Sequence, residues 1–132
     1  MVQSELAGAL DMLLKILAKK CWEAGLDNFM YNGYIESIQA HICVHLNYEP
    51  ASSDFYVVEI KTSESSETFR FTDKNIMNVE AMPLIILSHA FVKKGFLDKI
   101  MAAIHKTVKA MEDLTEGISK VTAKLKGDIY GN

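Results

Sequence analysis

The stretch IQAHICVHLNY, residues 38–48, decides the fold. Its even-numbered residues are apolar, and its odd-numbered residues are mostly polar. A period of two is typical of a β-strand that turns one face to a core and the other to solvent. No other part of the chain carries so long an alternation, so residues 38–48 predict the principal strand of a sheet.

Two further strands follow this stretch. Residues 55–62 are rich in β-branched and aromatic side chains, and residues 68–72 alternate again. Polar loops at 49–54 and 63–67 join them, so we expect an antiparallel meander within residues 34–72. The pair Asn32-Gly33 is typical of a tight hairpin turn, and a fourth short strand at 29–31 follows if that turn forms.

Helical patterns precede and follow the predicted strands in the sequence. Residues 4–24 space their apolar side chains at three and four, with Ser4 as the expected N-cap and Gly25 as the expected end. Residues 79–94 predict a second helix, with Pro83 in its first turn, and Gly95 predicts the break after it. Residues 96–126 predict a long third helix. The fold class is therefore α+β, with the two later helices packed on one sheet face of a single domain over residues 1–132.

The third helix carries a narrow apolar stripe. The spacing between successive apolar residues of the stripe alternates between four and three residues. The exception is two consecutive spacings of three, from Val108 to Met111 and from Met111 to Leu114, which form a local phase slip. A helix of about thirty residues extends roughly 45 Å and should overhang its domain, so this stripe needs a partner. The first helix or a second copy of the chain can supply one, and we favour a homodimer. The predicted interface residues are Ile104, Val108, Met111, Leu114, Ile118, Val121 and Leu125.

The strand at 55–62 is apolar on both sides, which leaves open which sheet face is buried. Either Phe55 and Val57 or Tyr56, Val58 and Ile60 share a face with the histidines of residues 38–48. An exposed apolar patch of this kind marks an interface, and we include Phe55 and Val57 in it. The alternative is that the long C-terminal helix covers this face.

Composition narrows the classes of partner. The chain has 132 residues, 49% of them hydrophobic and 23% charged, which is the balance of a folded domain. Its net charge of -3 disfavours nucleic acid and anionic lipid as partners. Two cysteines, Cys21 and Cys43, are too few for a disulfide framework, and the N-terminal residues lack the basic start of a secretory signal. We therefore expect a cytoplasmic protein with no association with a membrane.

His41, Cys43 and His45 alternate on one strand face and form the one candidate metal site. Residues two apart on a strand lie about 7 Å apart, so the outer two are too far from each other to bind one ion comfortably. A zinc site would need His89, His105 or a second copy to complete it. Cys43 lacks the glycine-rich elbow of a nucleophilic enzyme, so catalysis is disfavoured.

The sequence favours a non-catalytic protein-binding module, a regulator, inhibitor or chaperone-like protein that acts as a small acidic homodimer without a cofactor. A protein that binds a metal or small ligand through His41, Cys43 and His45 is the first alternative, and a nucleic-acid-associated protein is the second. The expected order of elements occurs in proteins of unrelated function, so topology alone identifies neither the partner nor the pathway.

Overall fold

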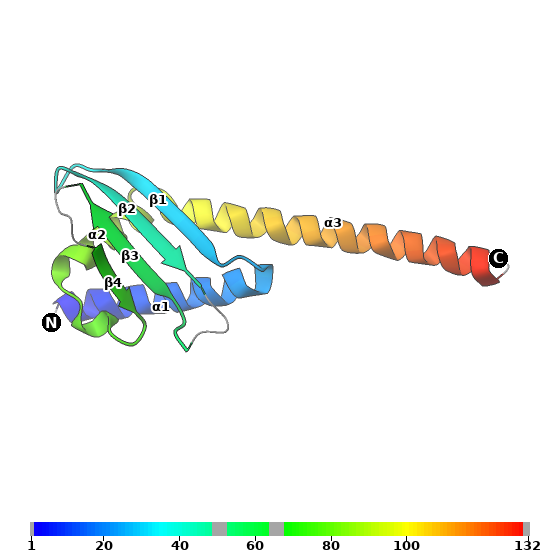
Figure 1. Ribbon diagram of the computed structural model, residues 1–132, viewed down its shortest axis with the longest axis horizontal. Coiled ribbons are helices and arrows are strands. Elements are labelled where there is room, and N and C mark those ends of the chain that lie inside the picture. The colour runs from blue at the N-terminus through cyan, green and yellow to red at the C-terminus, as the bar shows by residue number, and fades with distance from the viewer. Residues whose placement is uncertain (1, 49–52, 64–67, 131–132) are drawn as a thin grey trace.

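The computed structural model describes residues 2–48, 53–63 and 68–130. It confirms the α+β fold class, with an N-terminal helix, an antiparallel sheet, a short helix and a long C-terminal helix (Figure 1). The elements in order are α1 (Val2–Ala24), β1 (Asn28–Ile35), β2 (Ala40–Asn47), β3 (Val57–Thr62), β4 (Thr68–Thr72), the 3-10 turn η1 (Ile76–Asn78), α2 (Ala81–Val92) and α3 (Phe96–Tyr130).

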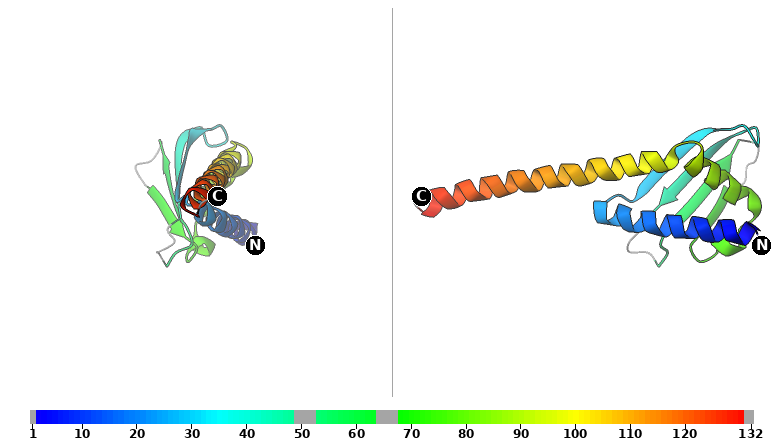
Figure 2. Two further views of the ribbon diagram at one scale, coloured as in Figure 1. Left: turned by 90° about the vertical axis from the view of Figure 1, so that its right-hand side faces the viewer. Right: turned by 180° about the vertical axis from the view of Figure 1, so that it is seen from behind.

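The four strands form one meander in the order β1-β2-β3-β4, and every neighbouring pair is antiparallel. All three helices lie on the same side of this sheet, and the other side is open, as the end-on view in Figure 2 shows. The sheet therefore has one face in the core and one face that none of the described helices covers, which is common for antiparallel sheets.

The buried face carries the even-numbered residues of β2, a point that the sequence left open. Val44 of β2 lies opposite Ile60 of β3, and Leu46 lies opposite Val58; all four side chains are fully buried. The helices contribute their own buried side chains to the same core: Leu10, Leu14, Leu17 and Cys21 from α1, Leu84, Ile86 and Leu87 from α2, and Phe96 and Ile100 from α3. Burial of the apolar side chains is what joins sheet and helices.

The predicted hairpin turn at Asn32-Gly33 is wrong. β1 runs straight through both residues and pairs with the whole of β2, and the chain reverses instead between Glu36 and Gln39, where Gln39 adopts a positive φ of 51°. A Cβ at position 33 would collide with the Tyr31 ring. Glycine at this position lets the Tyr31 ring lie close to the strand, and a side chain there would force that ring to shift.

The predicted helix bounds need small corrections. α1 begins at Val2 rather than at residue 4, so Ser4 lies inside the helix and is not its N-cap. α2 spans 81–92 rather than 79–94, and α3 continues to residue 130 rather than 126. The predicted breaks are confirmed: Gly25 and Gly95 have φ values of 73° and 74°, the left-handed conformation that glycine adopts easily.

One buried hydroxyl ties α1 to the sheet, and another has no partner. The Tyr56 hydroxyl donates a hydrogen bond to Asp11 Oδ1 at 2.6 Å, and Asp11 Oδ2 lies 3.0 Å from Lys15 Nζ. Burial, followed by the hydrogen bond to Asp11, raises the pKa of Tyr56 well above its ordinary value. The Tyr48 hydroxyl is also buried, yet it has no hydrogen-bond partner among the described residues.

We predict that Tyr56→Phe lowers the free energy of unfolding by about 1–3 kcal/mol, because it removes a hydrogen bond to a charged carboxylate. Tyr48→Phe is the matched control and should leave that free energy unchanged or raise it, since it removes an unsatisfied buried hydroxyl. Urea unfolding of both variants measures the difference. Equal losses in the two variants would contradict the hydrogen-bond argument.

The two cysteines differ in exposure, and their reactivity should differ accordingly. Cys21 is fully buried in the core, where burial raises its pKa from 9.0 to about 11, whereas Cys43 lies half-buried on the open sheet face. At pH 7.5 we expect a maleimide to label Cys43 quickly and to label Cys21 only in denaturant. The Cys43→Ser variant should lack the fast phase, and a fast phase that survives in it would contradict this assignment.

Candidate functional site

Helix α3 is longer than the body of the protein can cover. Its 35 residues extend about 52 Å, and its distal half projects beyond every other element (Figures 1 and 2). Phe96, Ile100 and Ile104 near its start belong to the core. From Val108 through Lys126 every residue of the helix is exposed. The candidate site is this projecting segment.

Six large apolar side chains lie along the projecting segment, and we call them the α3 seam: Val108, Met111, Leu114, Ile118, Val121 and Leu125. Between 36% and 69% of each is exposed to solvent. Ile104, which we also predicted at the interface, differs from them because it is only 7% exposed and packs in the core of its own chain. The structure thus divides the predicted stripe into an inner end that the fold buries and an outer part that it leaves uncovered.

The α3 seam keeps one face along its whole length. Ile104, Met111, Ile118 and Leu125 are each seven residues apart, which places them in line along a helix that pairs with another helix. Leu114 and Val121 lie three residues after Met111 and Ile118 and widen the stripe on one side. The consecutive steps of three near residue 111 therefore do not interrupt the helix, which is continuous to Tyr130.

Charged residues from Glu112 to Lys126 are separated by sign, and Lys109 lies just before them. Glu112, Asp113 and Glu116 form an acidic block, and Lys120, Lys124 and Lys126 form a basic block that follows it. Within the chain, Glu116 Oε1 lies 3.2 Å from Lys120 Nζ, both well exposed, so this pair contributes little to stability. Neither Glu112 nor Lys126 forms an ion pair with another described residue.

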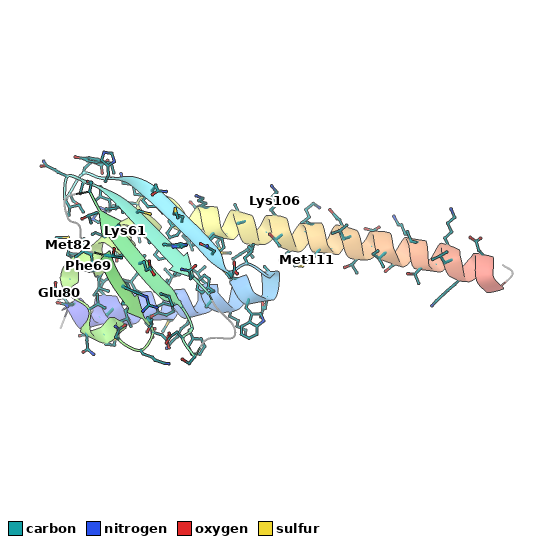
Figure 3. The ribbon with its side chains drawn as sticks, viewed as in Figure 1. Lys61, Phe69, Glu80, Met82, Lys106 and Met111 are labelled. Atoms are coloured by element: carbon teal, nitrogen blue, oxygen red, sulfur yellow. The ribbon has the colours of Figure 1, made fainter. Side chains whose placement is uncertain are left out.

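An open groove lies where α1 ends beside α3. Its lining residues are Glu23 from α1 and Val108, Met111, Glu112, Thr115 and Glu116 from α3. The side chain of Trp22, next to Glu23, is 60% exposed at the same end of α1. Met111 is labelled in Figure 3, at the point where the projecting segment leaves the body. The groove therefore combines two apolar side chains with three carboxylates at the inner end of the α3 seam.

His41, Cys43 and His45 lie on the open sheet face, opposite the buried even-numbered residues of β2. They do not converge: His45 Nε2 lies 2.6 Å from Asn28 Oδ1, and the His41 ring contacts the Tyr34 ring, with centroids 5.0 Å apart. Within the described parts of the chain, no group of three or more His, Cys, Asp or Glu residues is placed to hold a metal ion.

The two histidines that could complete such a site are on the other side of the molecule. His89 belongs to α2, where its Nε2 lies 3.4 Å from Ser37 Oγ, and His105 belongs to α3. Both helices cover the opposite sheet face from His41 and His45 (Figure 2). A zinc site on the open face would therefore need ligands other than His89 and His105.

Phe55 and Val57 do not extend the α3 seam. Val57 lies half-buried on the open face beside Asn47 and Thr72, and Phe55 is 60% exposed with Lys15 Nζ 5.5 Å from its ring centroid. Tyr56, Val58 and Ile60 are the residues of this segment that enter the core. The open face is otherwise mainly polar, and α3 does not cross it. That Phe55 and Val57 belong to an interface stays a prediction.

Among the features that the structure describes, the α3 seam is the largest run of uncovered apolar side chains. In the described residues, no helix combines the length and the apolar character needed to cross a bilayer. Comparisons of the chain with protein-family models, with curated proteins and with solved structures found no match.

Proposed function

We propose that this chain is a non-catalytic protein-interaction module, of the regulator, inhibitor or chaperone-like kind, that works as a homodimer formed through the α3 seam. The observation that carries this proposal is the uncovered stripe of six large apolar side chains on a helix that projects from the body. Contiguous exposed apolar surface of this kind is uncommon on monomers and marks sites of association.

A second copy is the partner that fits the seam best. The seven-residue spacing of Met111, Ile118 and Leu125 is the spacing with which helices pack side by side, and a second copy presents the same spacing. α1 is a poorer partner, because Leu10, Leu14 and Leu17 already place its apolar face in the core. α1 also ends at Ala24, near the inner end of the seam.

The contacts around Cys43 favour the non-catalytic interpretation. A cysteine nucleophile needs an adjacent base that is itself oriented toward the thiol. The two nearest candidates along the strand have other contacts, since His45 lies within hydrogen-bond distance of Asn28 and His41 packs on Tyr34. Their interactions are those of ordinary cross-strand pairs.

We predict that Met111→Asp weakens self-association at least about 100-fold. The substitution replaces an apolar contact worth roughly 1.5–3 kcal/mol with a charge, and a symmetric dimer suffers this change twice. Sedimentation equilibrium over a range of protein concentrations measures the dissociation constant.

Ala102→Asp is the matched control for this variant. Residue 102 is exposed on α3 and lies nine residues before Met111. Nine residues correspond to two and a half turns, so residue 102 lies on the side of the helix opposite the seam. This variant should dimerise like the wild type. A wild-type protein that stays monomeric at all concentrations, or a Met111→Asp dimer of unchanged strength, would overturn the proposal.

A further inference from the structure

We infer that the two copies pair antiparallel about Ile118, so that the basic block of each α3 lies against the acidic groove of the other. This inference rests on the proposed self-association and specifies its geometry. Three features of the projecting segment lead to it: its length, the order of its charged blocks and the position of the groove.

The first feature is the length of the projecting segment. The seam positions that repeat every seven residues along it are Met111, Ile118 and Leu125, and Ile118 is the midpoint of these three. In an antiparallel pair centred there, residues whose numbers add to about 236 lie opposite each other, so Met111 meets Leu125 and Ile118 meets its own copy. The seam of each copy then covers the seam of the other from Met111 to Leu125. The two bodies then lie at opposite ends of the pair.

The second feature is the order of the charged blocks. Antiparallel pairing about residue 118 brings the acidic block at 112–116 opposite the basic block at 120–126, and it does so twice by symmetry. Parallel pairing instead places acid beside acid and base beside base, which is repulsive. Glu112 and Lys126 are two seven-residue repeats apart and lie on the same flank of the seam. Each follows a seam position by one residue, Glu112 after Met111 and Lys126 after Leu125, and Glu112 lines the groove beside the seam.

The third feature is the groove beside the end of α1. It adds Glu23 to Glu112 and Glu116, so the acidic side is strengthened at the place that the partner's basic block would reach. Val108 and Met111 line the same groove and would meet the apolar residues near the end of the partner helix. The end of α1 thus becomes part of the interface, although α1 carries no part of the seam.

Cysteine cross-linking tests the orientation directly, in a Cys43→Ser background that removes the half-buried native thiol. Chains carrying Glu112→Cys are mixed with chains carrying Lys126→Cys, and oxidised glutathione accepts the electrons as the two thiols form a disulfide. Mass spectrometry then identifies the linked pair. In the antiparallel pair these positions lie within two residues of the same level, about 3 Å along the helix axis, whereas two copies of residue 112 are about 18 Å apart along it, too far for a disulfide.

We expect the mixed 112–126 disulfide and little 112–112 disulfide. A dominant 112–112 disulfide would overturn the antiparallel arrangement and leave self-association through the seam intact. A dimer of normal strength that forms neither disulfide would also overturn the inference. Failure of the wild-type chain to self-associate would instead remove the proposed function, and the two failures are therefore distinguishable.

A charge exchange provides the second measurement, with the dimer dissociation constant as its readout. Glu112→Lys with Glu116→Lys should weaken the dimer at least about tenfold, because both blocks then carry the same sign. Adding Lys124→Glu and Lys126→Glu to that chain should restore most of the lost affinity, since opposite charges again face each other. The wild-type dimer should weaken as salt is raised. Absence of restoration, or a wild-type dimer that strengthens with salt, would contradict the antiparallel pairing.

Discussion

The rest of the structure depends on one contact, the packing of the even-numbered face of β2 against the helices. Val44 and Leu46 lie at the centre of this contact, with β3 beside them and α1 and α2 above them. Burying each side chain of this size contributes roughly 1.5–3 kcal/mol, so a sheet with one apolar face requires helices on that side alone. The opposite face stays open because its side chains are mainly polar and gain little from being covered.

The same contact determines where α3 points. Phe96, at the start of the helix, stacks on Phe91 of α2 with ring centroids 5.2 Å apart, and it lies 5.8 Å from the Tyr31 ring of β1. Gly33 leaves the space in which that tyrosine ring lies, and Lys99 Nζ donates a hydrogen bond to the Met30 carbonyl at 3.1 Å. The first turns of α3 are therefore held by contacts with α2 and β1, and the remainder of the helix continues in the direction that they set.

The proposed association follows from this division of α3 into a held part and a free part. The sheet offers a limited apolar area, and α1, α2 and the first turns of α3 occupy it, so the seam beyond Val108 has no further surface to contact among the described residues of its own chain. Apolar residues on the free part gain from burial only against another molecule. Charges that flank a stripe of this kind decide which orientation of that molecule is favoured.

By itself the sequence determined the elements and the face of each that is apolar, because side-chain period depends on local backbone geometry. The alternation of residues 38–48, the breaks at Gly25 and Gly95 and the long stripe on α3 could all be predicted in this way. Only the tertiary structure decided that Ile104 is core while Met111 is exposed, that Asn32-Gly33 continues a strand, and that His89 and His105 lie across the sheet from His41. Those outcomes depend on how segments that are distant in the sequence pack against one another, and the spacing of residues along the chain does not determine that packing.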